Sequence, residues 1–133
     1  MKRTRLRRQR RVKSLRKQLW PEFSLLIRQR DGRCLMANQE FGACGGVLNA
    51  SHIYPKGKYP LLELFPLNAK SLCMVHHLYV WHKNPIESAA WLRRVLPTDW
   101  IERLIAEKNQ SLSRKGMSEE AIRAEWKTHG LGE

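Results

Sequence analysis

The sequence predicts a small α+β domain that is braced by a metal site and flanked by further helices. All three cysteines and four of the five histidines fall between Cys34 and His82. The same segment contains two short strand patterns followed by a helical pattern. A chain of 133 residues can bury only a limited core, so a metal that cross-links the domain would add stability that packing alone supplies poorly.

The charge of the chain indicates a polyanionic partner. Lys and Arg number 25 against 12 Asp and Glu, which gives a net charge of +13 and a pI near 10.3. Such an excess favours nucleic acid or an anionic membrane surface. No apolar run approaches the roughly 20 residues of a membrane-spanning helix, and arginines stand where a signal peptide would be apolar. We therefore expect a cytoplasmic protein, in which reduced cysteines serve as metal ligands before they form disulfides.

The first residues predict an arm and then a short helix. Residues 1–18 hold ten Lys or Arg and no acid, which predicts a flexible arm or a helix that orders on DNA phosphates, with a merely solubilising tail as the alternative. From Leu19 to Ile27, Pro21 and Glu22 suit a first helical turn and apolar residues follow at helical spacing. This helix should end at Asp31-Gly32.

The central elements follow in order. Residues 34–44 form a glycine-containing excursion between two cysteines. Residues 47–53 are the best strand candidate, and residues 54–60 form a basic loop bounded by Pro and Gly. Residues 69–72 predict a second extended piece, and a helix should run from residue 73 to about residue 83.

The last part of the chain predicts helices. Asn84-Pro85 ends the preceding helix and begins another, because Pro suits a first helical position. Residues 86–96 carry an apolar stripe that should pack on the small domain. Residues 98–108 and 118–127 predict two more helices, with residues 111–116 as the linker between them.

Four side chains predict a structural zinc site. Structural zinc is held by four soft or borderline ligands, usually as two pairs from separate parts of the chain. Cys34 and Cys44 supply one pair, although the nine residues between them exceed the usual gap, and Cys73 and His76 supply the other at normal spacing. The alternative is three buried apolar thiols.

A second set of residues is separated from this quartet by helical geometry. Side chains of the adjacent His76 and His77 diverge by about 100° on an α-helix, so both cannot easily serve one site. His77 is then free to face a second site. His52 ends one predicted strand and Asn68 precedes the next, so a strand, loop, strand and helix carry His, Asn and His in order.

These residues resemble an HNH endonuclease. The resemblance is carried by Arg30-Asp31-Gly32-Arg33-Cys34, Ala50-Ser51-His52-Ile53, and Asn68-x3-Leu72-Cys73-x2-His76-His77. It covers about residues 19–85 and implies a ββα-metal core with a zinc-knuckle brace. Residues 1–18 and the helical extension 86–133 lie outside it. Small basic HNH proteins with such extensions are similar to those encoded by phages and mobile elements, which act in the bacterial cytoplasm.

The resemblance implies a role for each residue of the second set. His52 would be the general base that takes a proton from the attacking water, because an unperturbed imidazole with a pKa near 6.5 is largely neutral in the cell. His77 would ligate one Mg²⁺ or Mn²⁺ ion at the scissile phosphate. Asn68 would orient the His52 loop or approach the cation, and a simple capping role is the alternative.

Two positions depart from the family pattern. Ser51 stands where many members have an Asp or His ligand, and a hydroxyl is a poor ligand. A further ligand often lies four residues after the last motif histidine, where this chain has Trp81. His82 lies five residues on, about 140° away on an ideal helix. Either the helix loosens and His82 reaches the cation, or His82 contacts phosphate or caps the helix.

Lysines near this second set predict contacts with DNA. Lys56, Lys58 and Lys70 should hold the DNA backbone on either side of the cut, although each one alone is better explained by a solvated basic surface. The leading hypothesis is a metal-dependent HNH DNA endonuclease, a monomer or homodimer that nicks or cleaves double-stranded or branched DNA. The alternatives are a non-catalytic zinc-stabilised nucleic-acid-binding protein and a nuclease that acts on RNA.

Overall fold

The computed structural model describes residues 2–132 and, within them, the side chains of residues 6, 7 and 14–132. Met1 and Glu133, which begin the expected arm and end the expected extension, lie outside the described residues. The predicted α+β class is confirmed as a two-stranded antiparallel hairpin followed by helices. The elements are α1 (Lys2–Asp31), β1 (Leu48–His52), the 3₁₀ turns η1 (Pro60–Leu62) and η2 (Pro66–Asn68), β2 (Ala69–Cys73), the π-helix η3 (His76–Trp81), α2 (Pro85–Val95), α3 (Thr98–Ser111) and α4 (Glu119–Thr128).

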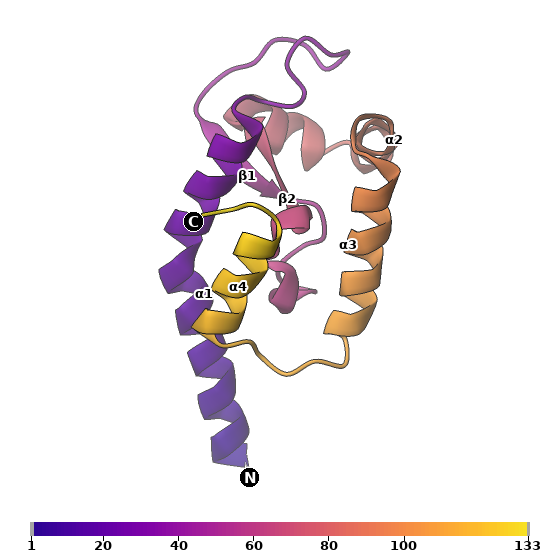
Figure 1. Ribbon diagram of the computed structural model, residues 1–133. Coiled ribbons are helices and arrows are strands. Elements are labelled where there is room, and N and C mark those ends of the chain that lie inside the picture. Colours follow the sequence, from indigo (N-terminus) through magenta and orange to yellow (C-terminus); the bar gives the residue numbers. More distant parts are fainter. Residues whose placement is uncertain (1, 133) are drawn as a thin grey trace.

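The hairpin lies at the centre of the molecule. β1 pairs with β2 so that Leu48 faces Cys73 at one end and His52 faces Ala69 at the other. A two-stranded hairpin is marginal by itself in water. Figure 1 shows it between α1 on one side and α3 on the other, with α4 lying against α1. The helices therefore supply the burial that the hairpin lacks.

Helix α1 begins much earlier than the sequence predicted. A helix was expected from Leu19, after residues that form a flexible arm or a helix that orders on DNA, whereas α1 runs without a break from Lys2 to Asp31 and its first part extends beyond the other elements in Figure 1. Arg, Lys, Gln and Leu, which dominate this stretch, are good helix formers. Pro21 lies inside the helix, where it removes one backbone hydrogen bond without ending the helix. None of the helices within residues 2–132 combines the length and apolar content that a membrane span requires.

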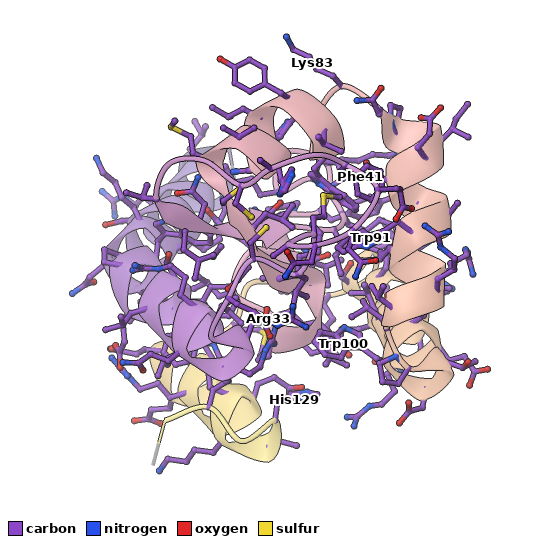
Figure 2. All side chains as sticks on the ribbon, turned by 90° about the horizontal axis from the view of Figure 1, so that it is seen from above. Arg33, Phe41, Lys83, Trp91, Trp100 and His129 are labelled. Atoms are coloured by element: carbon purple, nitrogen blue, oxygen red, sulfur yellow. The ribbon has the colours of Figure 1, made fainter. Side chains whose placement is uncertain are left out.

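Two apolar clusters hold the helices on the hairpin. In the first, Phe23 and Ile27 of α1 are fully buried together with Trp126 of α4. In the second, Leu72 of β2 packs with Trp91 of α2 and with the loop that follows α1. Phe41 and Trp91, labelled close together in Figure 2, make an edge-on contact with ring centroids 6.0 Å apart.

Most other elements agree with the sequence predictions. Strands expected over residues 47–53 and 69–72 are β1 and β2, and the three C-terminal helices are α2, α3 and α4. Ser118 caps α4, since its hydroxyl accepts the Ala121 N–H at 3.1 Å. The helix expected over residues 73–83 is different in kind, because residues 76–81 form a π-helix.

Candidate metal centre and histidine cleft

The four residues predicted to hold a structural metal come together. One ligand atom from each of Cys34, Cys44, Cys73 and His76 lies within 4.8 Å of every other. Cys34 and Cys44 come from the loop after α1, while Cys73 ends β2 and His76 begins η3. This Cys3His cluster could hold a metal ion.

The His76 ring is fixed in the orientation of a ligand. Its Nε2 donates to the Gly42 carbonyl at 3.1 Å, so the neutral ring leaves a lone pair on Nδ1. Nδ1 lies 3.3 Å from the Cys34 sulfur and 3.7 Å from the Cys44 sulfur. Ligand histidines commonly donate their other nitrogen to a carbonyl in this way. The ring is fully buried, which restricts other orientations.

The pKa values of the cluster thiols depend on one another. Burial tends to raise the pKa of Cys73, but N–H groups of His76 and Gly45 outweigh burial and lower it. Desolvation and hydrogen bonds with Cys34 and Cys73 raise the pKa of Cys44 to about 11. Three adjacent thiolates repel one another, and a bound cation would allow all of them to ionise.

The second set of histidines lines a cleft of about 820 Å³. His52 lies at the end of β1, and His77 and His82 belong to η3 and its C-terminal end. Trp20 of α1 forms part of one wall, and residues of α2 and α3 form the opposite side. The described residues that line the cleft include Lys56 and Arg93 but no Asp or Glu.

His52 is held as a neutral imidazole with one free nitrogen. Its Nε2 donates to the Glu63 carbonyl at 2.8 Å, and because a carbonyl only accepts, the proton lies on Nε2 and the lone pair on Nδ1. The Trp20 ring packs against the imidazole with centroids 5.0 Å apart. Burial lowers the pKa of His52, and the hydrogen bond to Glu63 offsets part of this effect.

Asn68 braces the loop between the strands. Its Oδ1 accepts the Tyr54 N–H at 2.8 Å, and its Nδ2 donates to the carbonyls of Tyr54 at 3.1 Å and Leu62 at 3.0 Å. The side chain is fully buried and is not among the cleft-lining residues. Of the two roles expected from the resemblance, this geometry agrees with orienting the loop next to His52.

The π-helix brings His77 and His82 side by side. The His82 N–H donates to the His77 carbonyl at 3.2 Å, an i to i+5 hydrogen bond, and the two rings are 4.6 Å apart. An α-helix would separate these side chains by about 140°. The wider π-helix is the loosened helix that one of the alternatives for His82 requires. Burial, followed by the charges of His82, Lys70 and His52, lowers the pKa of His77 to about 4.

Lys70 does not lie where the sequence predicted. It was expected to contact the DNA backbone, but its side chain is fully buried opposite Ser51 in the hairpin. Its ammonium donates to Ser51 Oγ at 3.2 Å and lies 3.3 Å from the centre of the Trp81 ring. Lys56 and Lys58 are exposed, as expected, and Lys56 lines the cleft.

Sequence reasoning missed several residues that shape the cleft. The Glu63 carbonyl accepts the hydrogen bond from His52 Nε2, and the Glu63 carboxylate pairs with Arg16 at 2.8 Å. The Asn49 amide lies 3.5 Å from His77 Nδ1. Asn49 pairs with Leu72 in the hairpin, so the register of the two strands could have placed it near the helix that follows β2. The contact of Trp20 with His52 has no corresponding pattern in the sequence.

Comparisons of the chain with protein-family models, with curated proteins and with solved structures find no match. The fold and the site therefore define the molecule as a small α+β protein with a Cys3His cluster that could hold a metal. A cleft lined by three histidines, with no acid among its described lining residues, includes His77, the neighbour of His76 in that cluster.

Proposed function

We propose that this protein is a metal-dependent endonuclease of the HNH type that hydrolyses phosphodiester bonds in DNA. The observation that carries the proposal is the environment of His52, which is neutral, fixed through Nε2 and placed in a cleft with His77 and His82. The order of His52, Asn68 and His77 along a strand, loop, strand and helix agrees with the resemblance described above.

In this proposal His52 acts as the general base. Its Nδ1 accepts a proton from the water that attacks phosphorus. The hydrogen bond from Nε2 to the Glu63 carbonyl holds the tautomer and remains favourable when the ring becomes positively charged. Asn68 keeps the intervening loop in place through its three hydrogen bonds, so it is a positioning residue.

His77 and His82 would hold the catalytic cation. Both offer ring nitrogens, and no carboxylate lines the described part of the cleft. Mg²⁺ prefers oxygen ligands, whereas imidazoles suit transition metals, so the donor set fits Mn²⁺ or a later divalent ion better than Mg²⁺. Such a cation supplies Lewis acidity that offsets charge on the leaving 3′ oxygen.

The Cys3His cluster would hold a structural Zn²⁺ ion. Three thiolates and one imidazole complete a tetrahedral set and leave no open position for a substrate. The ion would join the loop after α1 to the end of β2 and the start of η3. Because His76 and His77 are adjacent, this link also fixes where His77 enters the cleft.

The expected substrate is DNA with little sequence selectivity. The net charge of +13 and the exposed Lys56 and Lys58 suit phosphate contacts, which position a duplex but read no bases. The basic first part of α1 extends beyond the body of the protein, which suits the same backbone contacts.

Replacement of His52 tests the proposal. His52→Ala should reduce nicking of supercoiled plasmid about 100- to 10,000-fold, the range expected on loss of a general base. DNA binding and the zinc content should not change. The matched control is His129→Ala, because His129 lies outside the cleft and contacts Glu125 at 3.0 Å.

Two outcomes would assign another function. A wild-type protein that binds DNA but cleaves nothing in Mg²⁺, Mn²⁺ or Ni²⁺ would be a non-catalytic zinc-stabilised nucleic-acid-binding protein. Cleavage of RNA with intact DNA of the same sequence would identify a ribonuclease.

A further inference from the structure

The Lys70 side chain is buried in the core, and no carboxylate of the described residues lies within ion-pair distance of its Nζ. A buried charge that nothing compensates is strongly destabilising. A lysine buried in this way therefore requires an explanation.

The groups around Lys70 Nζ all suit an ammonium. Its neighbours are Ser51 Oγ at 3.2 Å, the Ser51 carbonyl at 3.5 Å and the His52 carbonyl at 3.4 Å. The face of the Trp81 ring, 3.3 Å away, completes the surroundings. Burial holds the pKa of Lys70 well below its ordinary value, and Asp31 offsets only part of that shift, whereas oxygen acceptors, an aromatic face and a nearby anion all favour the charged form.

The amino group of Lys70 lies directly behind the wall of the histidine cleft. Trp81 and His52, which contact Nζ, also line the cleft. Only the Trp81 ring lies between Lys70 Nζ, 3.3 Å from the ring centre, and the cleft that Trp81 lines, so a charge on Lys70 would act on a group bound there. No Asp or Glu lines the described part of the cleft to neutralise that charge.

We propose that Lys70 is the internal counter-charge for a phosphate group bound in the cleft, so that the phosphate binds without a divalent cation. The inference rests on the proposed function, because it assigns part of the positive charge that holds the same phosphodiester. The free cleft then disfavours divalent cations, and bound phosphate favours them. By linkage, the cation and the phosphate each strengthen the binding of the other.

The test is a titration of the zinc-loaded full chain with inorganic phosphate in buffer freed of other divalent metals. NMR signals of the His52 and His77 rings report binding in the cleft. Lys70→Met should weaken phosphate binding about tenfold, the size that Coulomb's law gives for unit charges some 10 Å apart at an effective dielectric constant near 20. The matched control is Lys83→Met, because Lys83 also lies over an aromatic ring, that of Tyr79, but extends away from the body in Figure 2.

Thermal unfolding separates this role from a structural one. Replacement of a buried charge by an apolar side chain of similar length often leaves stability unchanged or raises it, so Lys70→Met should melt no lower than the wild type. A melting temperature that falls, with phosphate binding unchanged, would make Lys70 a structural residue and overturn the proposal. Lys70→Gln, which keeps donors but no charge, gives the same comparison if the methionine variant does not fold.

The remaining outcomes are also decisive. The inference is overturned if the wild-type rings do not respond to phosphate, or if neither Lys70 variant binds phosphate more weakly. Failure of the proposed function is distinguishable from both results, because phosphate binding that depends on Lys70 can be measured even if the protein cleaves nothing. Cleavage that depends on His52 with phosphate binding indifferent to Lys70 would remove this inference alone.

Discussion

The Cys3His cluster and the histidine cleft begin at adjacent residues, His76 and His77, yet they differ in the properties that decide ion binding. The cluster brings four ligand atoms within 4.8 Å of one another, and its histidine is fully buried and oriented by the Gly42 carbonyl. The cleft offers two neighbouring imidazoles, no carboxylate among its described lining residues, and an ammonium behind its wall.

This contrast teaches how one turn of helix can serve two kinds of site. The closed, soft donor set suits a resident ion, whereas the open pair of imidazoles needs oxygens from a ligand to complete coordination. The first site would then be occupied at all times and the second only with substrate. Each prediction below tests one side of that contrast, in order of expected effect.

The largest effect should follow loss of the cluster. Cys73→Ser removes a buried thiol of the cluster, and the zinc content should fall from about one ion per chain to nearly none. The free energy of unfolding should fall by more than about 4 kcal/mol, much of the roughly 5–15 kcal/mol of a typical domain, because binding of a structural metal is coupled to folding. Elemental analysis and urea unfolding measure both quantities.

The matched control for this variant is His77→Ala. His77 belongs to the cleft, so its removal should leave the zinc content unchanged and the free energy of unfolding within about 1 kcal/mol, as is usual for sites outside the core. Equal loss of zinc from both variants would show that the two sites are not separate.

The next effect concerns His82 and tests whether the π-helix builds a two-histidine site. His82→Ala should reduce the rate of plasmid nicking about 10- to 100-fold and raise the Mn²⁺ concentration needed for half-maximal rate, because the cation loses one of its protein ligands. Lys83→Ala is the control, since Lys83 is the exposed neighbour that extends from the body. A His82 variant with the wild-type Mn²⁺ requirement would leave His82 as a helix cap or phosphate contact.

A moderate effect should appear in the pH dependence of cleavage. His52 must be neutral to accept a proton, and its pKa lies below the ordinary value of 6.5 because of burial, despite the hydrogen bond to Glu63. The nicking rate should therefore be flat above about pH 6.5 and should fall about tenfold per pH unit only below the lowered pKa. Rates are measured at saturating Mn²⁺, with circular dichroism at each pH to confirm folding. A midpoint above about 6.5 would contradict the neutral environment described for this ring.

The sequence predicted the parts of the site that depend on local pattern. Cys73 and His76 have a spacing that any helical turn brings together, and His52 and Asn68 stand at the ends of strands that alternation and flanking turns predict. These residues lie where they were expected, although the activity assigned to them remains a proposal.

The remaining features depend on tertiary structure. Lys70 is buried where it pairs with Ser51 in the hairpin. The residue types of that strand do not predict this burial. The π-helix depends on its C-terminal end, where the Asn84 N–H donates to the Val80 carbonyl and the Ser88 hydroxyl contacts the same oxygen. Helix α1 extends to Lys2, beyond the helix that its apolar pattern predicts.

The smallest effect should come from the exposed lysines, and it sharpens the difference between surface and internal charge. Lys56→Met should weaken binding of a short fluorescent duplex by less than about 1 kcal/mol, because an exposed charge at 0.1 M salt is largely screened. The slope of log K against log salt should fall by about 1, as expected for one lost phosphate contact. Fluorescence anisotropy between 50 and 200 mM salt, the range in which such contacts weaken strongly, measures both values.

Lys58→Met provides the comparison within the same loop. Lys58 is exposed but does not line the cleft, so its removal should change the salt slope without changing the nicking rate at saturating DNA. Lys56 lines the cleft and lies 3.8 Å from Glu63, whose carbonyl accepts from His52, so its removal should change both. Identical rates for the two variants would show that the charge of Lys56 at the rim of the cleft contributes only to DNA binding, in contrast to the internal charge proposed for Lys70.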